Sequence, residues 1–172
     1  INREPSLFSV RYDDLFELSL QRRKGALQKG VLMLGAGKAL LPDSNIFRVE
    51  GQLDTLDLAQ WQPVLEQIRT ASKNYQENID SSRMSLLDDS RVHIGNLILS
   101  ERNLGPIQIE LARLQNDWQV RLSGDSVAGT AQLPAYVFKG ASQFTAQDRP
   151  VLVNLDHIRL PENEDKTEED VW

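Results

Sequence analysis

The chain has 172 residues and a formal net charge of −6, with 40% hydrophobic and 26% charged residues. A chain of this length and composition can bury the core of one ordinary domain. The negative charge argues against a nucleic-acid binder and against passive adhesion to an anionic membrane, because both need a basic face. The absence of cysteine excludes disulfides and thiolate metal ligands.

No segment of the sequence is apolar for long enough to cross a bilayer, and the first residues, Ile-Asn-Arg-Glu-Pro, do not resemble a signal peptide. We therefore expect the chain to be an internal piece of a longer protein, with any membrane anchor outside it.

Most of the chain alternates between apolar and polar residues. Phe8, Val10 and Tyr12, for example, are separated by Ser9 and Arg11. The same alternation recurs at residues 16–20, 47–53, 107–111, 118–122, 127–133 and 151–155. It predicts strands with one apolar and one wet face, which is typical of an antiparallel sheet. Turn-forming residues between the segments predict a meander, with strands over about 6–53 and about 91–160.

One stretch, residues 57–78, repeats its apolar residues at helical spacing and predicts an amphipathic helix. Asp57 or Thr55 is the expected N-cap. Pro63 predicts a kink, or a helix that begins there. The polar face lacks the basic excess of a membrane-surface helix, so we expect the helix to pack on the sheet. Its predicted anchors on the sheet are Trp61, Leu65 and Ile68.

The chain is thus expected to form a single β-rich unit over residues 1–161. Residues 162–172 contain the run Glu-Asn-Glu-Asp-Lys-Thr-Glu-Glu-Asp, which has almost nothing to bury. They predict an acidic, mobile tail.

A spacing of the form apolar-x-x-apolar-x-apolar occurs three times, at residues 53–58, 94–99 and 155–160. A strand that skips two residues instead of one must change face, and a β-bulge does this by inserting one extra residue. The first and third copies share Leu-Asp-x-[Leu/Ile]-x-Leu, which suggests tandem β-units in a longer array.

The sequence gives little indication of a catalytic, metal-binding or cofactor-binding site. His93 and His157 lie in strand patterns without a companion cluster such as His-x-x-x-His, so surface histidines are favoured over a metal or acid–base pair. No carboxylate has the spacing of a calcium loop, and Asp88 and Asp117 are interpreted as turn residues. Residues 30–37 contain Gly-x-Gly outside the strand–turn–helix context of a dinucleotide site. We predict no metal, no cofactor and no enzymatic activity.

Several segments, taken in order, resemble the AsmA-like family, most closely its YhdP type. Residues 47–61, Phe-Arg-Val-Glu-Gly-Gln-Leu-Asp-Thr-Leu-Asp-Leu-Ala-Gln-Trp, are similar to the family's segment of strand, Gly, Leu-Asp-x-Leu-Asp-Leu and Trp. The segments that follow in the family's order are 92–99, 104–111, 118–122, 127–134 and 155–161. The resemblance covers nearly the whole chain, and its specificity comes from that order.

The resemblance implies a curved, taco-like β-groove or open half-barrel with an apolar concave face. It also implies a function as a segment of a periplasmic bridge that carries phospholipid between the inner and outer membranes of a Gram-negative bacterium, within an inner-membrane-anchored protein. The expected partners are phospholipid acyl chains and neighbouring β-repeats of the parent chain.

Two hypotheses follow. A lipid conduit requires a continuous apolar concave face, whereas a structural or protein-binding β-module requires a filled core and open sheet edges. The predicted groove-lining residues are Phe47, Val49, Ile107, Ile109, Leu111, Trp118, Val120, Leu122, Val127 and Val153.

Overall fold

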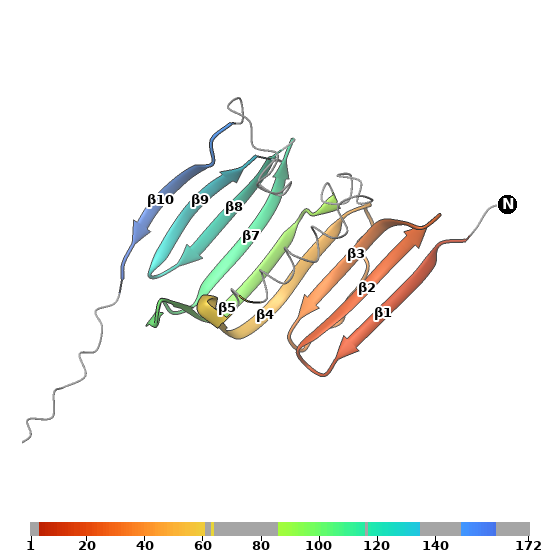
Figure 1. Cartoon of the computed structure of the whole chain (residues 1–172), viewed down its shortest axis with the longest axis horizontal. Coiled ribbons are helices and arrows are strands. Elements are labelled where there is room, and N and C mark those ends of the chain that lie inside the picture. The colour runs from red at the N-terminus through yellow and green to blue at the C-terminus, as the bar shows by residue number, and fades with distance from the viewer. Residues whose placement is uncertain (1–3, 61–62, 64–85, 116, 135–148, 161–172) are drawn as a thin grey trace, which may run out of the picture.

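The computed structural model describes residues 4–60, 63, 86–115, 117–134 and 149–160, and these residues form one open sheet of ten strands (Figure 1). The strands are β1 (Ser6–Tyr12), β2 (Phe16–Arg23), β3 (Ala26–Leu34), β4 (Phe47–Asp57), β5 (Ser90–Leu99), β6 (Arg102–Asn103), β7 (Ile107–Leu114), β8 (Asp117–Gly124), β9 (Val127–Leu133) and β10 (Leu152–Ile158). Their order in the sheet is β1-β2-β3-β4-β5-β7-β8-β9-β10, with β6 paired to β5. The predicted fold class, a mainly β open sheet, is confirmed.

Tight turns join several of the antiparallel neighbours. Lys24 and Gly25, between β2 and β3, have φ values of 52° and 80°. Two successive positive φ angles define the two-residue turn whose twist matches that of the flanking strands. Ser100 and Glu101 make a similar turn between β5 and β6, with φ values of 51° and 66°. The chain order therefore becomes the spatial order, as a meander requires.

The sheet is not antiparallel throughout, because β4 pairs in parallel with both β3 and β5. The prediction of an antiparallel meander is therefore wrong at this strand. Parallel neighbours need a long crossover connection, and residues 35–46 and 58–89 supply the two crossovers. Alternation shows which residues share a face, but it does not show the direction in which the next strand returns.

The two crossovers begin on opposite faces of the sheet. In the first, Gly37 lies against the side chain of Met33, which points to the polar face. In the second, Leu58 packs on the hydrophobic core of the other face, and the Leu87 carbonyl accepts a hydrogen bond from Trp118 Nε1 at 2.7 Å. Residues 58–60 are helical, and Asp57 Oδ1 accepts the Ala59 N–H at 2.9 Å, which confirms Asp57 as an N-cap.

The predicted helix anchors Trp61, Leu65 and Ile68 lie outside the described residues, and so does the predicted acidic tail. Among the helices that are described, none is long and apolar enough to cross a membrane.

The bulge predicted at the third copy of the motif is present. Between β9 and β10 the register slips at Asp156, which has no partner on β9. In β4 and β5 the two copies of the motif lie side by side, with Leu53 opposite Ile94 and Leu56 opposite Leu97. Although Ile94 and Leu97 are three positions apart, both are buried in one cluster. Each strand has therefore changed face, as the spacing predicted.

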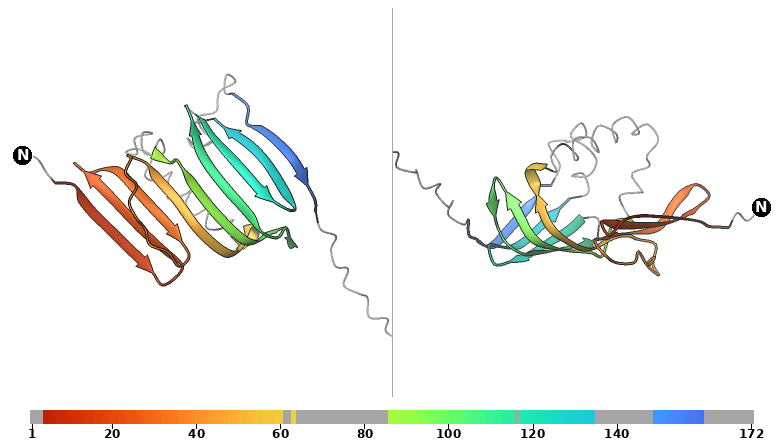
Figure 2. Two further views of the ribbon diagram at one scale, coloured as in Figure 1. Left: turned by 180° about the vertical axis from the view of Figure 1, so that it is seen from behind. Right: turned by 90° about the horizontal axis from the view of Figure 1, so that it is seen from below.

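The sheet is curved. Figure 2, right, views it along its edge, and the strands from β4 to β10 curl toward the side from which the short helical turn after β4 rises. This concave side carries the hydrophobic core, made of Ile94, Leu97, Leu104, Ile107 and Val127.

Candidate functional site

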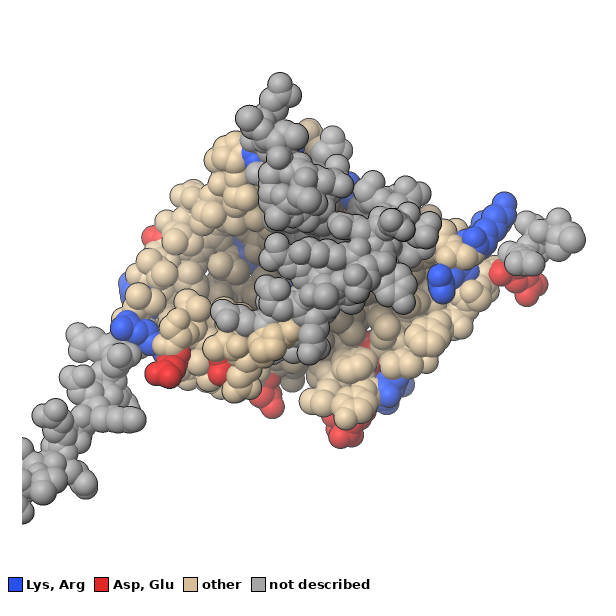
Figure 3. Space-filling view, viewed as in Figure 1, with Lys and Arg blue, Asp and Glu red and all other residues tan. Residues whose placement is uncertain are grey.

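The concave side of the sheet is a continuous apolar surface, called here the apolar face. Residues opposite one another on neighbouring strands point to the same face. One such row crosses every strand of the main path without a charged member: Tyr12, Phe16, Leu34, Gly51, Val92, Ile109, Leu122, Gly129 and Leu155. A second row joins Leu111, Val120, Ala131 and Val153. Figure 3 looks onto this side, and the charged side chains on view lie mainly around its outline.

Burial varies strongly across the apolar face. In the middle of the sheet, Ile94 is 1% exposed, Ile107 3% and Trp118 2%. On the edge strands, Phe8 is 51% exposed and Val153 61% exposed. The same alternating pattern therefore makes a closed core in the middle and uncovered apolar surface at both edges.

All of the predicted groove-lining residues lie on the apolar face, and the register brings them together on β4, β7, β8, β9 and β10. Ile107, Trp118 and Val127 are buried, and Val153 is exposed. The others are half-buried: Phe47, Val49, Ile109, Leu111, Val120 and Leu122.

Strands β1–β3 contribute a part of the apolar face that was not among the predicted groove-lining residues: Phe8, Val10, Tyr12, Phe16, Leu18, Leu20, Leu32 and Leu34. Their alternation was visible, so the signal existed. What was missing was the register that aligns these strands with the rest of the face.

Trp118 closes one end of the apolar face. Its indole Nε1 donates to the Leu87 carbonyl, and the Arg113 guanidinium lies 5.1 Å from the ring centroid, within range of a cation–π contact. Asp88 Oδ1 accepts the Arg113 backbone N–H at 2.7 Å. These contacts tie the second crossover to β7 and β8 and hold the Trp118 side chain in one position.

Asp117 was predicted to be a turn residue, but it is the first residue of β8 and is buried. Its carboxylate accepts hydrogen bonds from Gln132 Nε2 at 3.0 Å and from both terminal nitrogens of Arg149, with Nη1 at 2.8 Å. The prediction was wrong because the ion-pair partner, Arg149, is 32 residues away and no local sequence pattern indicates the pairing. The ion pair fastens the start of β10 to the β7–β8 turn.

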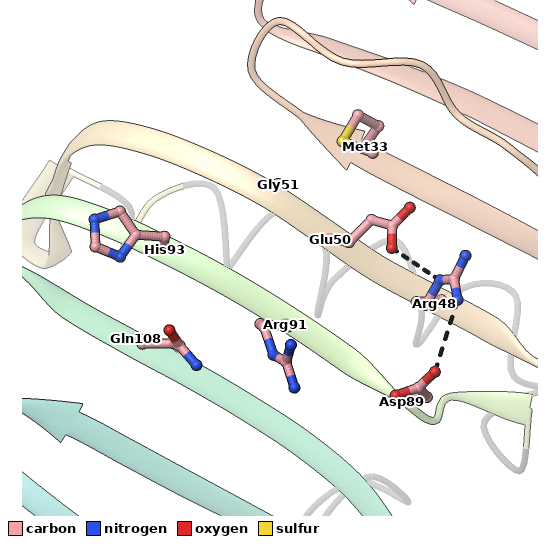
Figure 4. A pocket seen from close by; sticks show the side chains of 8 residues that line it. All are labelled: Met33, Arg48, Glu50, Gly51, Asp89, Arg91, His93 and Gln108. Carbon is pink, nitrogen blue, oxygen red and sulfur yellow. Dashed lines mark ion pairs between the residues drawn. The ribbon is translucent and has the colours of Figure 1, made fainter.

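The opposite, convex side is mainly polar, although the buried Val31 also faces it, opposite Ser19 and Arg48. A hollow of about 510 Å³ on it is lined by Met33, Arg48, Glu50, Gly51, Asp89, Arg91, His93 and Gln108 (Figure 4). Its cations are paired: Arg48 Nε lies 3.0 Å from Glu50 Oε2, and Arg91 Nε lies 2.9 Å from Glu110 Oε1. The Arg91–Glu110 pair is largely exposed on the arginine side, and exposed pairs contribute little to stability.

The two histidines do not meet. His93 lies on the polar face, whereas His157 Nε2 lies 3.1 Å from the carbonyl oxygens of Gly124 and Asp125, at the β8–β9 turn. Within the described ranges, no group of three or more histidines and carboxylates could hold a metal ion.

A curved open sheet with an apolar concave face and a mainly polar convex face defines a β-rich protein class whose inner surface is suited to apolar contact. The YhdP protein family matches residues 2–171, so the chain belongs to the YhdP family. The family points to a bacterial envelope protein connected with lipid transport. Searches found no curated relative and no solved structure similar to the chain.

Proposed function

We propose that the chain is a segment of a periplasmic bridge that carries phospholipid between the inner and outer membranes. In this proposal acyl chains lie along the apolar face, and headgroups stay in water at its open rims. The inner-membrane anchor lies outside the chain, and neighbouring β-repeats of the parent protein continue the sheet on both sides.

The observation that carries the proposal is the uncharged row that crosses the sheet from Tyr12 to Leu155 and stays exposed at both ends. A large contiguous apolar surface is uncommon on a soluble monomer and marks a site of interaction. Acyl chains suit it chemically, because burying each CH₂ group contributes about 0.8 kcal/mol. A surface of this kind needs no specific polar recognition, so one face can accept phospholipids with different headgroups.

A structural or protein-binding module without lipid cargo is the second candidate. The closed cluster around Ile94 and Ile107 favours it, because side chains already fill that part of the concave face. The two candidates differ at the edge strands, where the face is uncovered. Neither candidate assigns a catalytic group to the chain, and we propose that it is not an enzyme.

The test is native mass spectrometry of the purified chain, followed by lipid extraction. Val153→Asp places a charge on the apolar face of β10, whereas Asn154→Asp places the same charge on the polar face of the same strand. Both positions are exposed, so neither substitution disturbs the core.

Lipid carriage predicts that phospholipid co-purifies with the wild-type chain and with Asn154→Asp, and that Val153→Asp retains several-fold less. A stable, monodisperse and lipid-free wild-type chain would overturn the proposal and leave the structural module. Equal lipid on both variants would place the lipid elsewhere than on the apolar face.

A further inference from the structure

The third copy of the bulge motif lies on the last strand of the sheet. β10 carries Leu155, Asp156 and Ile158, and among the described residues no strand pairs with its outer edge. Leu155 and Ile158 are 45% and 55% exposed. An exposed apolar edge strand is a template for another strand, and proteins normally cover it.

The first two copies show how strands with this motif pair. β4 and β5 run in parallel, with Leu53 opposite Ile94 and Leu56 opposite Leu97. Between these pairs, Asn96 Nδ2 donates to the Asp54 carbonyl at 3.3 Å. A Cβ added at Gly95 would lie 2.8 Å from the same carbonyl oxygen, which is backbone and has no room to move. The Gly-Asn pair of β5 therefore fits closely against the Asp54 carbonyl, at the point where β4 changes face.

The outer edge of β10 is geometrically equivalent to the edge of β4 that holds β5. β4 is parallel to β5, and the four antiparallel steps from β5 through β7, β8 and β9 to β10 restore the same direction. Both strands have their preceding neighbour on the same side, as Figure 1 shows. The register places the apolar residues of both strands on the concave face.

β10 changes face at the corresponding position of the motif. Its register on β9 slips at Asp156, so Leu155 and Ile158 both remain on the apolar face, as Leu53 and Leu56 do on β4. His157 Nε2 and the Arg159 N–H contact the carbonyls of the β8–β9 turn, which hold this conformation from the inner side.

We infer that the outer edge of β10 binds a β-strand that runs parallel to it and carries an apolar-Gly-Asn-apolar segment, with its glycine opposite Asp156. The expected register places the first apolar residue of the partner opposite Leu155 and the second opposite Ile158. β1 of another copy fits poorly, because its sequence, Ser-Leu-Phe-Ser-Val-Arg-Tyr, has no glycine. This inference concerns the sheet edge and does not depend on lipid carriage.

The test uses the absence of native cysteine. Leu155→Cys and Ile158→Cys are introduced singly in the whole chain. Each variant is mixed with a synthetic peptide of the β5 sequence, Ser-Arg-Val-His-Ile-Gly-Asn-Leu-Ile-Leu, that carries cysteine at the position of either Ile94 or Leu97. The readout is disulfide yield, because cysteines more than about 7 Å apart at Cα do not bridge.

Parallel docking predicts that Leu155→Cys bridges the Ile94 position and Ile158→Cys the Leu97 position, each with a yield at least about five-fold above the exchanged combinations. A peptide with Gly95→Val should lose this preference. An exchanged pattern would show antiparallel docking and overturn the inference. Yields no higher than those of a scrambled peptide, or equal yields at Val10→Cys on β1, would also overturn it.

Discussion

The middle and the edges of this sheet are made of the same kinds of residue but differ strongly in how much of their apolar surface is exposed to solvent. Ile94 on β5 and Val153 on β10 both occupy apolar positions in alternating strands and both point to the concave face. Ile94 is among the most deeply buried side chains described, whereas Val153 is mostly exposed. Alternation therefore determines the face of a residue, and position in the sheet determines whether that face is covered.

The difference separates two roles. The middle strands hold the fold together, because the hydrophobic effect acts only on surface that is removed from water. The edge strands contribute little of this kind to the isolated chain, so their apolar side chains are available to a lipid or another strand. A chain built in this way can lose its edge contacts without losing its core.

The largest expected effect comes from opening the core. Ile94→Ala should lower the free energy of unfolding by about 2–5 kcal/mol, since it removes buried methylenes and leaves a cavity. Val153→Ala is the matched control on the edge and should change stability by less than about 0.5 kcal/mol. Urea denaturation of both variants measures this. Equal losses would mean that edge and middle are covered alike.

A smaller effect is expected at the Asp117–Arg149 ion pair. Arg149→Met keeps an apolar stem but leaves the buried Asp117 carboxylate with Gln132 as its remaining side-chain donor in the described structure. An under-satisfied buried polar group costs about 1–3 kcal/mol. Because Arg149 fastens the start of β10, the substitution should increase the rate of backbone hydrogen exchange more in β10 than in β5. Unchanged exchange in β10 would show that the ion pair does not hold the edge strand.

Much of this structure could be predicted from the sequence because it depends on local spacing. The alternation placed Ile107, Trp118 and Val120 on one face, and the apolar-x-x-apolar spacing located the bulge of β10 and the changes of face in β4 and β5. The N-cap at Asp57 was also visible, since a capping carboxylate binds an N–H group two residues away.

What the sequence did not predict depends on long-range contact. The parallel pairing of β4 follows from the paths of two crossovers, and the burial of Asp117 follows from an arginine far along the chain. The exposure of β10, at the end of the strand order, required that order to be known. None of these features leaves a periodic mark in the sequence.

The central claim is that acyl chains contact the apolar face, and two adjacent residues of β10 test it directly. Leu152 and Val153 are exposed to similar extents, 57% and 61%, but Leu152 points to the polar face and Val153 to the apolar face. A photoreactive benzophenone amino acid is placed at each position in turn and irradiated in the presence of a tagged phospholipid. The proposal predicts several-fold more labelling from position 153 than from position 152. Equal labelling, or more from position 152, would contradict it, because lipid would then be following exposed apolar surface without regard to the face.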